Sequence, residues 1–353
     1  MIFINEMASN TSNPEMHTEK NFCEEEEESS IITDDMQNRD ETCIKSEGFF
    51  KFKTEVKWFN AIFIIFLHIS MLYACFTFEW CKDFRTNIWA LIQFAIEATG
   101  ITAGAHRLWT HRAYKAKWPL RIILLIWYAS AGQNNLFDWV RDHRVHHKYT
   151  DTDADPHNSN RGFFFSHVGW LMLKKHPDVI RKGRQIDMRD ILADPVAMFG
   201  YKYFSILSFI FAFLVPIMVP VYGWNETWSR AFMSQIIRYV YGLNCIWSVN
   251  SVAHLWGPKP YDASINPTEN KYVAFIAIGE GWHNYHHVFP WDYKAAELGN
   301  YSLNFTTMFI DFCAKIGWAY DLKQPSEKLI RNVVMKNDHS LRQSVSHPSR
   351  KID

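Results

Sequence analysis

The chain has 353 residues, and 16% of them are aromatic, including 27 Phe and 15 Trp. This aromatic content exceeds that of an ordinary soluble protein of this length. The 37 basic and 37 acidic residues cancel to zero net charge, which gives no electrostatic reason to expect a nucleic-acid partner. The six cysteines form no Cys-x-x-Cys pair, so they argue against thiolate metal ligands and fit a reducing compartment.

The first 48 residues are polar and contain an acidic run, Glu24 to Glu28. Such a composition predicts a disordered tail, with a partner-binding acidic segment as the alternative. No basic region followed by an apolar run stands near the start, so we expect membrane insertion through an internal span. Residues 324–353 form a second polar tail, and the domain between the tails covers 49–323.

Four apolar runs predict membrane-spanning helices at about 58–78, 88–105, 203–223 and 231–256. The first has about 20 uncharged residues, enough to cross a hydrocarbon layer of about 30 Å. The second contains one acid, Glu97, and the third contains Pro216 and Pro220, which should bend it. A shorter apolar run at 122–132 is expected to lie at the membrane interface.

The basic residues are unevenly placed around these runs. The short turns between the runs contain only Lys82, Arg85 and Arg230, whereas the long segment after the second run is rich in Lys and Arg. The positive-inside rule therefore places that segment and both termini in the cytosol. Four crossings put the two cap segments, 106–200 and 257–323, on the same side.

Histidines are clustered in these cap segments. The spacing H-x-x-H-H, which puts three imidazoles on one helical face, occurs at His143, His146 and His147 and again at His283, His286 and His287. His106 and His111 form a looser pair, and His254 ends the fourth apolar run. Nine histidines exceed the ligands of one ion, so we expect two metal ions. Imidazole suits iron, zinc, copper or nickel.

The offset of five between His106 and His111 does not fit one face of an α-helix. We therefore expect the second span to end between them and a loop to bring His111 back. A metal cluster at the mouth of an apolar helical bundle suggests an enzyme whose substrate is a lipid chain. Cleaving an unactivated C–H bond needs an oxidant stronger than a side chain, which two irons with dioxygen could supply.

Three acids alternate directly after the first H-x-x-H-H box, at Asp151, Asp153 and Asp155. They resemble a calcium loop, but Pro156 and Gly162 occupy the positions where an EF-hand needs glycine and glutamate. Asx-turns that end the histidine helix are the better interpretation. The remaining histidines of the cap are expected to make local hydrogen bonds, and they are His157, His167 and His176.

Four segments together resemble the membrane-bound acyl-CoA desaturases of animals, the stearoyl-CoA desaturase group, and most of all its insect branch. They read HRLWTHRAYKA, DHRVHHKYTDTDADPHNSNRGFFFSHVGW, NSVAHLWG and GEGWHNYHH. The resemblance covers about residues 50–320. It implies an all-α integral membrane protein with four transmembrane helices and a cytosolic helical cap that holds a histidine-rich dinuclear metal site. We expect it in the endoplasmic reticulum membrane, surrounded by membrane lipids.

The resemblance also implies two iron ions (Fe2+), O2 as oxidant, and electrons from a separate cytochrome b5 and its reductase. No H-P-G-G haem motif occurs in the sequence, which agrees with an external electron donor. Carried over residue by residue, the metal ligands are His106, His111, His143, His146, His147, His254, His283, His286 and His287. Asn250, one turn before His254, matches a water-mediated ligand position.

The same resemblance assigns residues to a long-chain acyl-CoA substrate. The positions that match acyl-CoA contacts are Asn60, Asn134, Arg141, Asp142, Lys174, Lys175 and Trp247. Gln133, Trp139 and Trp247 match residues that shape a bend in the acyl tunnel, and Phe94 and Ala98 match its closed end. Attraction of anionic lipid is the alternative for the two lysines, as lipid-facing packing is for Phe94 and Ala98.

Ile246 stands where better-known members carry threonine, which leaves the register of the acyl chain against the metals open. The sequence thus predicts an acyl-CoA desaturase that acts on a saturated or monounsaturated chain with Δ9 or Δ11 regioselectivity, the latter in pheromone biosynthesis. A di-iron membrane fatty acyl hydroxylase is the alternative, followed by a zinc-dependent membrane hydrolase. Chain length, double-bond geometry, successive desaturation and oligomeric state stay open.

Overall fold

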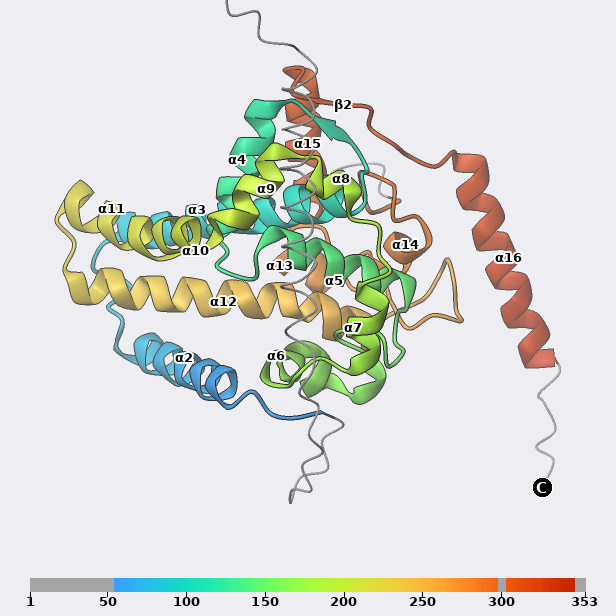
Figure 1. Cartoon of the computed structure of the whole chain (residues 1–353), viewed down its shortest axis with the longest axis horizontal. Helices are drawn as coiled ribbons and strands as arrows, with labels where there is room; N and C mark the ends of the chain where they lie inside the picture. Colours follow the sequence, from blue (N-terminus) through green and yellow to red (C-terminus); the bar gives the residue numbers. More distant parts are fainter. Residues whose placement is uncertain (1–53, 298–302, 347–353) are drawn as a thin grey trace, which may run out of the picture. The chain divides into compact units, whose positions relative to one another are not determined.

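The computed structural model describes residues 54–297 and 303–346 (Figure 1). The predicted tail 1–48 and the last residues of the chain lie outside these ranges. The described residues are helical apart from short loops and one antiparallel sheet of two strands, β1 (Lys115–Ala116) and β2 (Ala319–Tyr320). The prediction of a helical protein is confirmed.

The helices follow one another along the chain, and several are short. The longest are α2 (Trp58–Thr77), α3 (Phe84–Thr99), α12 (Trp228–Leu255) and α16 (Glu327–Ser346), and the π-helical stretches are η1 (Gly100–Thr110), η3 (Phe165–Gly169) and η4 (Phe209–Leu214). The shorter ones are α4 (Trp118–Ala129), α5 (Leu136–Lys148), η2 (Ser159–Arg161), α6 (Trp170–Met172), α7 (Pro177–Gly183), α8 (Arg189–Leu192), α9 (Pro195–Lys202), α10 (Phe204–Ser208), α11 (Val215–Trp224), α13 (Lys271–Ile276), α14 (His283–Val288) and α15 (Phe305–Lys315).

Among the described residues, three helical stretches are long and apolar enough to cross a membrane, 58–77, 84–110 and 204–224. They correspond to the first three predicted spans. The second starts earlier than predicted, where Asp83 caps α3 by accepting a hydrogen bond from the Arg85 backbone, and it ends later because η1 continues it to Thr110. The fourth predicted span coincides with α12, whose 28 residues extend over about 42 Å. Arg230 and Arg238 make α12 more polar than the other three.

Helix α12 packs against α2, α3 and α11, which lie alongside it in Figure 1. The shorter helices gather around the C-terminal end of α12, where η3, α13 and α14 contact it. Helix α4, predicted to lie at the membrane interface, packs mainly against η1. Gly100 permits this approach, because the backbone of Trp127 fills the space that a Cβ atom would need. The fold thereby places η1, α5, α12 and α14 at one end of the long helices.

The two prolines of the third span free backbone carbonyl groups that other helices then use. Pro216 has no N–H to give to Ala212 O, and the side-chain amide of Gln235 donates to that oxygen instead. Pro220 likewise leaves Pro216 O free, and the indole of Trp89 donates to it at 3.1 Å. A π-helical stretch, η4, precedes the first proline. The prolines thus link this span to α12 and α3.

Glu97, the single acid of the second predicted span, is buried and forms an ion pair with Arg238 of α12. Charged groups inside membrane helices ordinarily pair in this way, because an isolated charge there is costly. Gly242 makes the pair possible, since a Cβ atom at that position would collide with the Glu97 carboxylate. The partner of this acid lies 141 residues away in the sequence and was not predicted.

Candidate metal centre

Two helices carry the repeated histidine spacing, as predicted. Asn135 caps α5 by accepting a hydrogen bond from the Asp138 backbone at 2.9 Å, and this helix presents His143, His146 and His147 in its last turns. Helix α14 spans only six residues and begins at His283 itself. Both boxes are therefore helical, and each places three imidazoles along one face.

The pair His106 and His111 is brought together by a π-helix rather than by a loop. The backbone N–H of His111 donates to His106 O at 3.1 Å, an i to i+5 bond. The wider turn puts residues five apart on one face, and the two ring centroids lie 4.8 Å apart. The helix does end between the two histidines, at Thr110, but the predicted returning loop is wrong.

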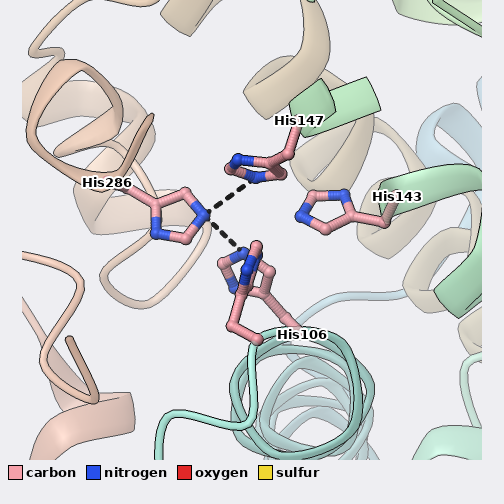
Figure 2. A group of neighbouring side chains, drawn as sticks. His106, His143, His147 and His286 are labelled. Carbon is pink, nitrogen blue, oxygen red and sulfur yellow. Dashed lines mark hydrogen bonds between the residues drawn. The ribbon is translucent and has the colours of Figure 1, made fainter. Parts of the chain in front are cut away.

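All nine predicted histidine ligands fall into two groups. Within each group the nitrogen atoms that could bind a metal lie within 4.8 Å of one another. The five-histidine group contains His106, His111, His143, His147 and His286, and the four-histidine group contains His146, His254, His283 and His287. Figure 2 shows four imidazoles of the first group pointing toward a common centre, with His286 Nε2 2.9 Å from His106 Nε2 and 3.1 Å from His147 Nε2.

Three carboxylates hold the outer nitrogen of one histidine each. Glu280 lies 2.9 Å from His106 Nδ1, Asp155 lies 2.9 Å from His146 Nδ1, and Asp151 lies 3.2 Å from His254 Nδ1. A neutral imidazole that donates from Nδ1 has only a lone pair at Nε2. In their neutral form these three histidines therefore present unprotonated nitrogens to the interior of the two groups.

Burial favours the neutral form of six of the seven histidines that lie outside η1 and α12. It lowers the pKa of His111, His143, His147, His283, His286 and His287. For His146 the burial effect is outweighed by Asp155, which raises its pKa. The Nε2 atoms of His111, His143 and His146 have no hydrogen-bond partner within the described part of the chain. Converging imidazole lone pairs fit two transition-metal ions with nitrogen ligands.

Glu280 is itself held by a buried arginine. Arg107 donates to Glu280 Oε1 at 2.8 Å and also to the backbone oxygen of Tyr293 at 2.9 Å. Burial alone would raise the pKa of Glu280, but Arg107 and His106 outweigh it and lower the pKa to about 2. The carboxylate is thus ionised and fixed beside His106.

A cavity of about 390 Å³ opens beside the histidines. Its walls are mostly apolar and come from α2, η1, α12 and the segment 132–134, while His106, His143 and His283 lie on its inner surface. The predicted substrate residues along this wall are Asn60, Gln133, Asn134, Trp139, Asp142 and Trp247. Asn250 and Ile246 line it as well. The cavity joins an apolar interior to the metal centre.

The other predicted substrate residues are not among those that line the cavity. Lys175 donates to Asp142 at 2.6 Å, and Arg141 also contacts this carboxylate, at 3.3 Å. Lys174 pairs with Glu55 at 2.8 Å. Ala98 is buried and one turn from Ile101, which does line the cavity, and the Phe94 ring packs on Tyr241 with centroids 5.3 Å apart. Their roles stay predictions.

Comparison with known proteins decides the family. Residues 86–314 match the family model described as "Fatty acid desaturase". The chain belongs to the fatty acid desaturase family. The match includes all nine histidines of the two groups, and the predicted family is confirmed.

Named members of the desaturase family match most of this chain. The acyl-CoA Delta-9 desaturase of Acheta domesticus is 56% identical over 291 residues, which are 82% of this chain and 81% of that protein. The acyl-CoA Delta(11) desaturase of Spodoptera littoralis is 51% identical over 281 residues, 80% of this chain and 83% of that protein. The stearoyl-CoA desaturase 5 of Bos taurus is 50% identical over 281 residues, with 79% and 83% covered.

The carboxylates that orient histidines in this desaturase were not predicted from the sequence. The predicted Asx-turn is present, since Asp155 accepts a hydrogen bond from the His157 backbone at 3.0 Å. Yet Asp155 also holds His146, and Asp151 holds His254. The interpretation of the acidic run as local turns did not predict these contacts. The available signal was the position of these acids next to the histidine boxes. Asp151 and Asp155 follow the first box, and Glu280 stands three residues before the second.

The three unassigned histidines are all hydrogen-bonded. His157 Nδ1 lies 3.1 Å from Asp155, with which it forms a third small group around His146, and His176 accepts a bond from the Asp178 backbone at 3.2 Å. These contacts are local, as predicted. His167 differs, because its partners lie far away in the sequence.

Proposed function

We propose that this protein is an acyl-CoA desaturase that inserts a double bond into a saturated or monounsaturated long-chain fatty acyl-CoA. The observation that carries the proposal is the position of the two histidine groups at the inner surface of an apolar cavity. The names of the relatives support acyl-CoA as the substrate class. In the overall reaction O2 takes up the two hydrogen atoms that the acyl chain loses, together with two electrons from the donor and two protons, and becomes two molecules of water.

We propose two iron ions as the metals, one in each histidine group. Nine imidazoles without a thiolate are compatible with iron, and bound iron with O2 would supply the oxidant that an unactivated C–H bond requires. The protein's own contribution is to fix the ligands. Asp151, Asp155 and Glu280 set which nitrogen of each partner histidine faces the centre, and this orientation raises metal affinity in proteins generally.

The acyl chain would occupy the apolar cavity, with Gln133, Trp139 and Trp247 shaping its bend and Phe94 and Ala98 closing its end. The CoA group would lie near Asn60, Asn134, Arg141, Asp142, Lys174 and Lys175. The contact of Lys175 and Arg141 with Asp142, at the cavity wall, supports this arrangement. Cations at this position are what phosphate groups require.

We propose that α12 is the fourth membrane span, with the metal centre and both termini in the cytosol. Its length of about 42 Å exceeds the hydrocarbon layer of about 30 Å. Its charged residues are paired, Arg238 with Glu97 and Arg230 with Glu226. The endoplasmic reticulum membrane follows from the proposed electron donor, cytochrome b5 with its reductase.

The experiment is expression in a yeast strain that lacks its own desaturase, followed by mapping of double bonds by mass spectrometry. Wild type should restore growth without added unsaturated fatty acid, and His143→Ala should not. The relatives named Delta-9 and Delta(11) desaturases are 56% and 51% identical to this chain, so we expect a Δ9 or Δ11 product. Saturated lipid only, from well-expressed wild type, would refute the proposal. Hydroxylated lipid would favour the hydroxylase.

A further inference from the structure

A chain of hydrogen-bonded side chains runs beside the cavity wall at Trp247. His167 Nδ1 lies 2.8 Å from Ser251 Oγ, and His167 Nε2 lies 3.1 Å from Asn244 Oδ1. The amide nitrogen of Asn244 lies 3.1 Å from His68 Nε2. The four residues come from α12, η3 and α2, so the chain ties three separate elements together. None of them belongs to the two metal groups.

Each hydrogen bond of the chain has a defined direction. The Asn244 amide nitrogen donates to the backbone oxygen of Val240 at 2.8 Å and to His68, so His68 Nε2 is an acceptor. A neutral imidazole that accepts at Nε2 carries its proton at Nδ1. That proton is donated to the backbone oxygen of Ile64, which lies 2.8 Å away. His68 therefore has a single tautomer in this structure.

The other half of the chain follows from the amide oxygen. Asn244 Oδ1 can only accept, so His167 Nε2 donates to it. The Ser251 hydroxyl has one hydrogen and two acceptors within reach, Trp247 O at 3.1 Å and His167 Nδ1 at 2.8 Å. Burial lowers the pKa of His167, and a neutral ring that donates from Nε2 can only accept at Nδ1, so the hydroxyl donates to His167. Each residue then donates to the next in the order Ser251, His167, Asn244, His68, and such a network specifies one geometry.

Both imidazoles of this network pack against the indole of Trp247. The His68 ring lies nearly parallel to it, with centroids 6.1 Å apart and an interplanar angle of 22°. The His167 ring meets it edge-on, at 5.9 Å and 83°. Trp247 and His68 both line the cavity, so the indole and the adjacent face of α2 form one wall of the acyl site.

Packing alone specifies the position of α2 weakly. Within α2 only Ala61 and Ala74 are fully buried, and both are small. Apolar contacts between membrane helices have no hydrophobic driving force in lipid, so hydrogen bonds between helices carry more of the specificity. The His68 to Asn244 bond is such a link, and it lies at the level of the cavity.

We infer that Ser251, His167, Asn244 and His68 are positioning residues that fix the Trp247 indole and the facing wall of α2. They thereby determine which pair of acyl carbons lies against the histidine groups. The inference rests on the proposed desaturase function. The residues act through Trp247, so their loss should change the position of the double bond more than the capacity to bind metal.

The test compares His68→Phe, Asn244→Leu and Ser251→Ala with wild type in the desaturase-deficient yeast. His68→Phe keeps an aromatic ring beside Trp247 but removes both hydrogen bonds. The ratio of shifted to wild-type double-bond positions should rise about fivefold in His68→Phe and Asn244→Leu, the factor that one net hydrogen bond is worth, and less in Ser251→Ala. Metal content per purified protein should stay at the wild-type level.

Thr77→Val is the matched control, since Thr77 of α2 also donates to a carbonyl four residues earlier but lies outside the cavity. It should leave the product positions unchanged. Metal-replete His68→Phe and Ser251→Ala proteins with the wild-type product positions would overturn the inference, and these two milder variants decide if Asn244→Leu fails to fold. Absence of any double bond from wild type would instead refute the proposed function.

Discussion

Nδ1 of His106 lies 2.9 Å from Oε2 of Glu280, inside the protein and away from solvent. Arg107, the next residue after this histidine, holds the other oxygen of the same carboxylate at 2.8 Å. A residue predicted to bind metal is therefore oriented by an acid that its own neighbour fixes. Three such carboxylates surround the two histidine groups. Because they orient metal ligands, their roles can be tested by measuring bound metal rather than activity.

Glu280→Gln should weaken metal binding. The amide has the size of the carboxylate but leaves Arg107 without its counter-charge, and it no longer holds His106 as an anion does. Loss of such a partner ordinarily costs about 10-fold to 100-fold in metal affinity. Metal per purified protein, measured after dialysis against a weak chelator, should fall. Glu79→Gln, at an exposed ion pair with Lys82, should retain the wild-type content. Equal metal retention in both variants would contradict the role of Glu280.

The acidic run after the first histidine box gives an internally controlled comparison. Asp151→Asn and Asp155→Asn should each reduce bound metal, because they remove the carboxylates that hold His254 and His146. Asp153 is exposed between them and provides the control, Asp153→Asn. Asparagine tolerates the left-handed backbone of Asp151, where φ is 57°, so this variant should still fold. The same metal loss in all three variants would indicate a general effect of charge.

Gly242→Ala should destabilise the bundle of long helices. The new Cβ atom would displace the Glu97 carboxylate from Arg238, and disrupting a buried ion pair costs on the order of 3 kcal/mol. Thermal unfolding in detergent measures the loss. Gly223→Ala in α11 is the control, since nothing lies within 4 Å of a Cβ atom there. Unfolding temperatures that agree between the two variants would show that the pair is not constrained by Gly242.

Ala98→Phe should shift the preference of the enzyme toward shorter acyl chains. Ala98 is buried one turn from the cavity residue Ile101, so a bulky ring would fill the predicted end of the tunnel. A change of this size in an apolar pocket is worth about 10-fold in relative rate between chains. Ala95→Phe, on an exposed position of the same helix, is the control. Unchanged product chain lengths in Ala98→Phe would show that Ala98 and Phe94 do not close the end of the tunnel.

The two H-x-x-H-H boxes could be predicted from the sequence because their spacing is a local property. His143, His146 and His147 share a helical face whatever the rest of the chain does, and the same holds for the second box. The way in which His111 approaches His106 could not be predicted. Residues five apart lie on different faces of an α-helix with 3.6 residues per turn, and only the π-helix brings these two onto one face. A change of helix type has no simple sequence signal.

Long-range polar pairs could not be predicted either. Glu97 and Arg238 are 141 residues apart, and Asn244 and His68 are 176 residues apart. Their partnership depends on how the helices are rotated against one another, which apolar runs do not specify. His167 shows the same limit, since it was expected to bond locally and instead bonds to two residues of α12.

We expect this centre to remove hydrogen from an acyl chain without adding oxygen to it. The measurement is incubation of the purified, metal-loaded enzyme with a long-chain acyl-CoA, cytochrome b5, its reductase, a reduced nicotinamide cofactor as electron source and 18O2, followed by mass spectrometry of the lipid and the water. We predict an unsaturated product without label and labelled water. A labelled hydroxyl group on the acyl chain, or turnover in the absence of O2, would contradict the account.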